Sequence, residues 1–224
     1  MAAHMELIRG SMPIPLSDDG VEEGEFVRDR VWAMGGVDSI NCSDLVRAIQ
    51  CAEIIADKRL PVRRVPALRT WCLGEYEGQP VDKVQPELDN LILNVPNFVI
   101  PGRGTDSTLP GESFNQFRDR VLGYETRRMR EWISAGSAEK VMDVTHRYVI
   151  HLIMAWHRLG CPADLSVDRK FMVSGVNTID TGSLWRWAPK QEGQWNFTKN
   201  RMRRNDPQLD PARWKVRHGE TEYN

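Results

Sequence analysis

The sequence has no long apolar run, no excess of charge of either sign and few cysteines. It carries 30 Lys and Arg residues against 31 Asp and Glu, which gives a formal net charge of -1. A general nucleic-acid binder derives its affinity from an excess of basic residues, so we do not expect a nucleic-acid partner. No stretch approaches the roughly 18 consecutive apolar residues that a membrane-spanning helix needs. The composition therefore argues against a polyanion binder and against an integral membrane protein.

The N-terminus and the cysteines indicate the same compartment. The opening residues MAAHMELIRGS lack the apolar run of about 7–15 residues found in a signal peptide, so we expect no export. The cysteines form no CxxC pair, and they are Cys42, Cys51, Cys72 and Cys161. Reduced, buried thiols of this kind are typical of cytoplasmic proteins, and we expect a cytoplasmic location.

Length and composition favour one domain over residues 1–224. Of the 224 residues, 41% are hydrophobic and 27% are charged, which is the ordinary composition of a globular protein. A chain of this length buries roughly 70% of its unfolded surface around one core. It therefore needs neither a disulfide nor a metal ion to hold its fold.

Segments with helical periodicity alternate with short apolar segments. Ser17, followed by two acids, predicts the N-cap of a first helix, and Ser43-Asp44 predicts the N-cap of a second. Helices are expected over residues 18–34, 45–55, 81–93, 112–132 and 146–159, the third despite an internal proline. The Pro- and Gly-rich stretch 95–111 is expected to be an irregular excursion.

The apolar segments between these helices predict strands. They are expected over residues 37–41, 63–68 and 140–145, more weakly over 165–172 and 176–179, as a hairpin over 182–198 that turns at 191–193, and over 214–216. Residues 199–213 are polar and basic and predict a connector. The alternation of strands and helices predicts a three-layer α/β/α domain with a mostly parallel sheet.

The sharpest local signal lies at the C-terminus. The short strand at residues 214–216 runs directly into the string Arg217-His218-Gly219-Glu220-Thr221. Such a strand delivers an arginine and a histidine into a turn opened by glycine, where backbone amides face an anion and an imidazole approaches phosphorus. The string therefore predicts a phosphate site, and it is a specific signal for its length.

This string resembles the active-site signature of the histidine phosphatase superfamily, the phosphoglycerate mutase-like proteins. Other segments are similar to recurrent segments of the same family. They are GSMPIPLS at residues 10–17, SDLVRAIQCA at 43–52, PGES at 110–113 and VTHRYVI at 144–150. The resemblance reaches from about residue 9 to residue 224, and it implies a phosphoglycerate mutase-like fold.

The order of these segments differs from the family's order. In the family the RHG strand comes first and the Pro-Leu-Ser segment follows it, whereas in this chain the RHG strand is last. The simplest interpretation is a circular permutation, natural or engineered, with the break after Asn224, because exposed neighbouring termini tolerate permutation. A fragment cut between two tandem copies is the alternative. The terminal strand can also be exchanged between two chains, so a monomer and a homodimer both stay open.

Four residues carry the expected chemistry. Neutral His218 is a competent nucleophile toward a phosphomonoester, and a phosphohistidine divides hydrolysis into two easier displacements. Arg217 and Arg47 supply planar forks that match phosphoryl oxygens. His146, at the start of a helix, adds a positive or hydrogen-bonding contact where charge develops.

The remaining assignments concern binding. Thr221 and Asn224 are neutral polar groups that we expect as further ligands of the phosphate, and Gly10 and Ser11 are expected to meet the organic half of the substrate. No metal ion or other cofactor is required. The other histidines lack the spacing of metal ligands and are expected to be structural, and they are His4, His151 and His157.

One residue departs from the family pattern. The family's general acid lies in a Leu-x-Glu or Leu-x-Asp segment, and in this chain that segment reads Leu68-Arg69-Thr70. A threonine hydroxyl does not protonate an alkoxide at neutral pH, and the loss of such an acid typically costs about 10²–10⁴-fold in rate. Glu75 and Glu112 are the alternative acids, unless the substrate has a good leaving group or turnover is slow.

The sequence as a whole predicts a phosphatase that hydrolyses a small phosphorylated substrate through a covalent phosphohistidine on His218. A phosphoglycerate mutase-type phosphotransfer is one alternative. A catalytically weak protein that binds a phosphate ester in a regulatory role is another, because Thr70 stands at the acid position.

Overall fold

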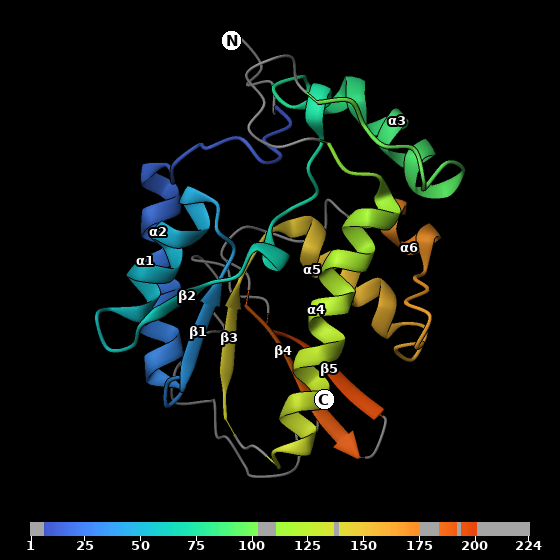
Figure 1. The fold of residues 1–224 in the computed structure, drawn as a ribbon. Helices are drawn as coiled ribbons and strands as arrows, with labels where there is room; N and C mark the ends of the chain where they lie inside the picture. The colour runs from blue at the N-terminus through green and yellow to red at the C-terminus, as the bar shows by residue number, and fades with distance from the viewer. Residues whose placement is uncertain (1–6, 103–110, 137–138, 175–183, 192–193, 201–224) are drawn as a thin grey trace.

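The computed structural model describes residues 7–102, 111–136, 139–174, 184–191 and 194–200 (Figure 1). The strands expected at residues 176–179 and 214–216 lie outside the described residues, and so does the string from Arg217 to Asn224. In the described part of the chain, no helix is long and apolar enough to cross a bilayer.

A parallel sheet of three strands forms the centre of the fold. Strand β1 (Ser39–Cys42) lies between β2 (Val62–Arg64) and β3 (Val141–Val144), in the order β2-β1-β3. In the register of the β1–β3 pair, Asn41 lies opposite Asp143, and Cys42 lies opposite Val144. All three strands therefore end at the same edge of the sheet, as expected for a parallel α/β domain.

Helices α1 (Asp18–Ala33) and α2 (Val46–Ala56) cover one face of the sheet (Figure 1). Their apolar residues share one buried cluster with β1 and β3. The cluster comprises Val27, Val31, Ile40, Cys42, Ala52, Ile55, Ala56 and Val144. The first helix begins as expected, because the side chain of Ser17 accepts a hydrogen bond from the backbone N–H of Gly20 at 3.2 Å.

Helix α2 begins differently from the expectation. Its N-cap is Leu45, without a side-chain cap, whereas the sequence predicts a cap at Ser43-Asp44. The Asp44 carboxylate accepts hydrogen bonds from both Nε and Nη2 of Arg69, so it is not available to the helix. The Ser43 hydroxyl accepts the backbone N–H of Leu45 at 3.3 Å, one residue before the helix, while Asp44 makes a long-range ion pair.

Helix α4 (Phe114–Ser134) lies on the other face of the sheet from α1 and α2 (Figure 1). A buried polar network joins it to the strands. The Asn41 amide donates to Asp143 Oδ1 at 2.9 Å, and Arg128 of α4 lies 3.0 Å from Asp143 Oδ2 and 2.7 Å from Glu125 Oε1. Polar residues of β1 and β3 thus meet α4, while their apolar neighbours meet α1 and α2. The expected layered arrangement is confirmed.

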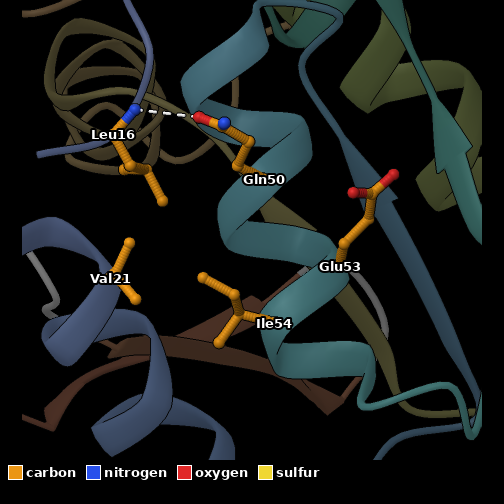
Figure 2. Close-up of a pocket in the computed structure, with 5 residues that line it drawn as sticks. All are labelled: Leu16, Val21, Gln50, Glu53 and Ile54. Atoms are coloured by element: carbon orange, nitrogen blue, oxygen red, sulfur yellow. Dashed lines mark hydrogen bonds between the residues drawn. The ribbon is translucent and has the colours of Figure 1, made fainter. Parts of the chain in front are cut away.

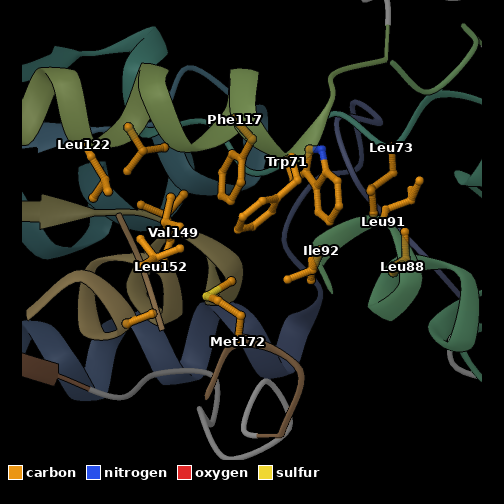
Figure 3. Packing of buried hydrophobic residues seen from close by; sticks show 14 of the residues in the cluster. Trp71, Leu73, Leu88, Leu91, Ile92, Phe117, Leu122, Val149, Leu152 and Met172 are labelled. Carbon is orange, nitrogen blue, oxygen red and sulfur yellow. The ribbon is translucent and has the colours of Figure 1, made fainter. Parts of the chain in front are cut away.

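A second, larger cluster joins α4 to α3 (Val81–Leu93), α5 (Arg147–His157) and α6 (Arg169–Ser174) (Figure 3). Its centre is Trp71, whose ring stacks on Phe117 at 5.9 Å between centroids and meets Phe114 edge-on at 5.7 Å. Helix α4 starts with a capping box between Ser113 and Gln116. The expected helices over 81–93, 112–132 and 146–159 are all present, with small shifts at their ends.

Two of the expected strands are wrong in extent or kind. The segment 165–172 is not a strand but runs into α6, because the Asp168 side chain accepts the backbone N–H of Phe171 at 3.0 Å and so caps a helix. The segment 63–68 is a strand only as far as Arg64, and the short 3₁₀ helix η1 (Pro66–Leu68) follows it. A proline at the first position favours that turn over a continued strand.

The expected hairpin is confirmed by its backbone pairing. Strands β4 (Leu184–Gln191) and β5 (Gln194–Asn200) form an antiparallel pair with an irregularity between Pro189 and Gln191. Strand β5 extends to Asn200, so it includes the first residues of the expected connector.

Candidate active site

The chain leaves β1 and β3 at Ser43 and His146, side by side at the carboxyl edge of the sheet. The backbone N–H of Ser43 donates to the carbonyl of Val144 at 2.9 Å, and His146 Nε2 lies 2.8 Å from the Ser43 hydroxyl. Ligand sites in parallel α/β sheets lie at this edge. Residues 43 and 146, far apart in the sequence, are therefore brought together by one pair of strands.

His146 is neutral in this environment. Burial and, to a smaller extent, the positive charges of Arg47 and Arg120 together lower its pKa to about 3. The sequence allowed a positive or a hydrogen-bonding contact at this position. The structure favours the hydrogen-bonding one, because a protonated imidazole would face two cations.

Arg47, in the first turn of α2, contacts the N-terminal segment of the chain. Its Nη1 donates to the carbonyl of Met12 at 3.0 Å, and its Nη2 donates to the carbonyl of Gly10 at 2.6 Å. Burial lowers the pKa of Arg47, and the nearby Arg9 acts in the same direction, whereas Glu77 acts against both. Neutral carbonyls do not cancel the charge of the guanidinium, so it keeps its attraction for an anion.

The segment that receives Arg47 is held from its other side by Glu77. The backbone N–H and the hydroxyl of Ser11 donate to Glu77 Oε1 at 2.8 and 2.7 Å, and the backbone N–H of Leu73 donates to the same oxygen at 3.1 Å. A backbone hydrogen bond from Ile8 to Gln79 at 2.8 Å adds a further attachment. The sequence did not indicate this role of Glu77, because a loop rich in Gly and Glu is typical of a solvent-exposed turn.

The N-terminal segment is attached to α2 a second time, one turn after Arg47. The backbone N–H of Leu16 donates to Gln50 Oε1 at 2.9 Å (Figure 2). This contact lies at a shallow, mainly apolar depression between α1 and α2, lined by Leu16, Val21, Gln50, Glu53 and Ile54. Residues 10–16 are therefore fixed along one side of α2.

Arg120 of α4 binds the loop that contains Thr70. Its guanidinium pairs with both oxygens of Glu112 at 2.7 and 2.8 Å and donates to the carbonyls of Ala67, Arg69 and Thr70 at 2.9, 2.9 and 3.1 Å. Glu112 also accepts the backbone N–H of Cys72 at 3.2 Å. Glu112, one of the alternative acids, is thus fully engaged as the anion of an ion pair.

Thr70 and Glu75 lie in different surroundings. Thr70 is buried, and its loop is tied to the end of β3 by the Thr145 hydroxyl, which donates to the carbonyl of Leu68 at 2.7 Å. Glu75 lies in the short 3₁₀ helix η2 (Gly74–Tyr76) with its side chain exposed to solvent. The fold thus places the loop of Thr70 beside the carboxyl edge of the sheet and leaves the Glu75 side chain in water.

The expected site residues divide into two groups. Arg47, His146, Gly10, Ser11 and Thr70 are described, and contacts link Arg47 to the segment of Gly10 and Ser11. The others lie outside the described residues, and they are Arg217, His218, Thr221 and Asn224.

Of the histidines expected to be structural, His151 and His157 have apolar or sulfur neighbours. His151 is fully buried with its ring 4.5 Å from that of Phe171, and His157 Nδ1 lies 3.2 Å from Cys161 Sγ. Among the residues the structure covers, no group of three or more His, Cys, Asp or Glu side chains could hold a metal ion.

The sequence is similar to one protein family and to individual members related to it. The sequence profile of the histidine phosphatase superfamily (branch 1) matches residues 2–182, a match that ends before Arg217. The adenosylcobalamin/alpha-ribazole phosphatase of Escherichia coli K12 is 26% identical over 182 residues, which cover 74% of this chain and 84% of that protein. The phosphoglycerate mutase-like protein 4 of Arabidopsis thaliana is 29% identical over 186 residues, covering 80% and 74%.

Solved structures show the same fold. A putative alpha-ribazole-5'-P phosphatase from Escherichia coli superposes with a TM-score of 0.61 at 19% identity, covering 86% of each chain. A mycobacterial glucosyl-3-phosphoglycerate phosphatase superposes with a TM-score of 0.60 at 19% identity, covering 86% of this chain and 90% of that one.

Proposed function

The chain belongs to the histidine phosphatase superfamily, branch 1, and from that premise we propose that it hydrolyses a phosphomonoester through a covalent phosphohistidine on His218. Relatives named as phosphatases, among them the Escherichia coli protein that is 26% identical over 182 residues, support hydrolysis as the reaction. The substrate is a small phosphorylated molecule.

The observation that carries the proposal is that the charge of Arg47 acts on His146 at the carboxyl edge of the sheet. Arg47 contacts carbonyls rather than a carboxylate, and the charges of Arg47 and Arg120 both act on His146. A phosphoryl group brings negative charge to this cationic edge. An uncancelled guanidinium and a neutral imidazole are suited to that charge, the first as a fork and the second as a hydrogen-bonding group.

The proposal also requires a place for the C-terminal strand. Strand β3 pairs with β1 along one edge, and within the described residues no strand pairs with its other edge. We expect the strand predicted at residues 214–216, which lie outside the described residues, to be central to the sheet and parallel to β3, in accordance with a circular permutation. Because parallel strands end at the same edge of a sheet, Arg217 and His218 then meet His146.

In the proposed reaction, a ring nitrogen of neutral His218 attacks phosphorus, and the bond from phosphorus to the ester oxygen breaks. The leaving oxygen takes a proton from solvent water, and a second water molecule then attacks the phosphohistidine to release inorganic phosphate and restore the imidazole. Arg217 and Arg47 bind the phosphoryl oxygens, with Thr221 and Asn224 as further ligands. Gly10 and Ser11 meet the organic half of the substrate.

None of the three residues considered as the general acid is suited to protonate the leaving group. Thr70 occupies the acid position, Glu112 is paired with Arg120, and Glu75 is exposed. A substrate whose leaving group needs little protonation, such as an aryl phosphate, is therefore the preferred class. The same lack of an acid favours a second candidate, a catalytically weak protein that binds phosphate esters.

Labelling with a generic aryl phosphomonoester that carries ³²P in its phosphoryl group tests the proposal. We expect an acid-labile, base-stable phosphoprotein in the wild type, none in His218→Ala, and an unchanged yield in the control His157→Gln. Label that persists in His218→Ala, or that maps to Ser or Thr, overturns the assignment. Transfer of the label to an added alcohol instead of water would identify a mutase-type phosphotransfer, and stoichiometric binding without label would favour the weak binding protein.

A further inference from the structure

Glu77 is a buried carboxylate that no step of the proposed reaction uses. Its side chain lies between the N-terminal segment and the loop after Trp71, with the residue only 7% exposed. Three hydrogen bonds converge on its Oε1, two from Ser11 and one from Leu73. A buried carboxylate is costly unless such donors stabilise it, so this cluster is a specific arrangement.

The contacts of Glu77 lead in two steps to Arg47. Ser11 is fixed on Glu77 through both its backbone N–H and its hydroxyl, while the carbonyls on either side of it, those of Gly10 and Met12, accept from the two terminal nitrogens of Arg47. A shift of Ser11 therefore moves both acceptors of the guanidinium. Glu77 also acts on Arg47 through its charge, which opposes the lowering of the Arg47 pKa by burial.

Gly10 is adapted to this arrangement. Its backbone has a φ of +45°, in the left-handed region, and a Cβ at this position would overlap the carboxylate of Glu77. The turn approaches Glu77 so closely that a side chain at residue 10 excludes the contact.

From these contacts we infer that Glu77 is the positioning residue for Arg47: it fixes the turn of residues 10–12, and that turn fixes the guanidinium. Glu77 has no part in proton transfer at Oε1, because an oxygen that accepts three hydrogen bonds carries no proton to give. The inference rests on the proposed function, in which Arg47 binds the phosphoryl group.

A double-mutant cycle between Glu77 and Arg47 tests the inference, with kcat and KM measured on an aryl phosphate. Glu77→Ala is expected to lower kcat about tenfold, since a misplacement of the order of 1 Å costs up to about a hundredfold in rate. In the Arg47→Ala background the same change is expected to lower kcat less than about twofold, because coupled residues are non-additive. Glu77→Gln, which retains an acceptor oxygen, is expected to lie closer to the wild type than Glu77→Ala.

Glu87→Gln is the control, because Glu87 is an exposed carboxylate on α3 that has no part in the proposed site. It is expected to leave kcat unchanged. If Glu77→Ala does not fold, Ser11→Ala removes one of the three hydrogen bonds and tests the same link. Equal losses in both Arg47 backgrounds, or a Glu77→Ala variant as active as Glu87→Gln, overturn the inference. A His218→Ala variant that keeps full activity overturns the proposed function instead, so the two failures are distinguishable.

Discussion

Arg47 and Arg120 both approach the carboxyl edge of the sheet, but their surroundings differ in one decisive respect. Arg120 is paired with both oxygens of Glu112, and it donates in addition to loop carbonyls. Arg47 contacts the carbonyls of Gly10 and Met12. The Arg120 guanidinium is neutralised by Glu112 and joins two segments of the fold. The Arg47 guanidinium donates these hydrogen bonds to neutral carbonyls, and the proposed function uses its charge to bind a phosphoryl group. The difference lies in the partners of the two arginines and not in their burial.

Replacing Arg120 gives the largest expected effect. Arg120→Ala leaves the partly buried Glu112 carboxylate without its partner and frees the loop carbonyls, which costs about 3–5 kcal/mol of unfolding free energy. Urea denaturation followed by tryptophan fluorescence measures the loss. Arg118→Ala is the control, because Arg118 pairs with the exposed neighbour Asp119 and is expected to cost at most about 1 kcal/mol. An Arg120→Ala variant as stable as the control would remove the contrast between the two arginines.

Replacing Arg47 is expected to affect the reaction more than the fold. If Arg47 is a transition-state contact, Arg47→Ala raises the kinetic barrier by about 2–4 kcal/mol, or roughly a hundredfold or more in kcat. Its unfolding free energy is expected to fall by about 1–3 kcal/mol, less than for Arg120→Ala, since two hydrogen bonds to neutral carbonyls are lost and no ion pair is broken. Steady-state kinetics on an aryl phosphate and urea denaturation measure both quantities. A large loss of stability with little loss of kcat would make Arg47 a structural arginine like Arg120.

The pKa of His146 depends on the charges of both Arg47 and Arg120. The pKa of His146 lies at about 3, far below its usual value near 6.5, because of burial and then Arg47 and Arg120. Removing a facing cation raises this pKa, and we expect Arg47→Ala to raise it more than Arg120→Ala does. Titration of the His146 ring protons by NMR measures both shifts, at a temperature where both variants are folded.

The lowered pKa values of His146 and His151 determine how the stability of the fold changes with pH. His146 and His151 have pKa values lowered in the fold, to about 3 and about 4, so the folded state favours their neutral forms. Their contribution to stability is complete above about pH 6.5 and is lost as the pH falls toward these folded values. Stability that did not decline between about pH 6.5 and pH 4 would contradict the burial of both rings.

The smallest expected effect concerns Thr70, whose loop Arg120 holds in place. If Thr70 occupies the acid position, the wild type hydrolyses aryl phosphates faster than alkyl phosphates, and Thr70→Glu narrows the gap by about tenfold. Thr70→Val, which has a similar shape and no hydroxyl, is the control and is expected to leave the ratio of the two rates unchanged. Equal rates on both classes in the wild type would mean that another group already supplies the proton.

The sequence could predict the parts of this structure that depend on local patterns. Ser17 caps its helix as expected, and Ser43 and His146 follow buried strands, which predicts that they meet at one edge. The start of α6 could also have been found, because Asp168 is an ordinary N-cap residue three positions before the N–H that it accepts. In that segment the apolar residues of 165–172 favour a strand, and the cap is the stronger signal.

The remaining features depend on partners that are distant in the chain. Asp44 pairs with Arg69, 25 positions away, and Arg120 with carbonyls more than 50 positions away. Nothing in the sequence around Arg120 distinguishes it from Arg118, on the same helix. Only its burial and its contacts with Ser11 make Glu77 a candidate, since no local pattern separates it from the exposed Glu75.

The buried network of Asn41, Asp143 and Arg128 allows only one register between strands β1 and β3. Side chains alternate between the two faces of a strand, so a slip of β3 by one residue would turn Asp143 toward the apolar cluster of α1 and α2 and leave Arg128 with one carboxylate fewer. The same slip would displace His146 by about 3.3 Å along the strand, farther than its contact with Ser43 tolerates. A polar cluster on the α4 face of the sheet thus selects the strand alignment in which Ser43 and His146 meet.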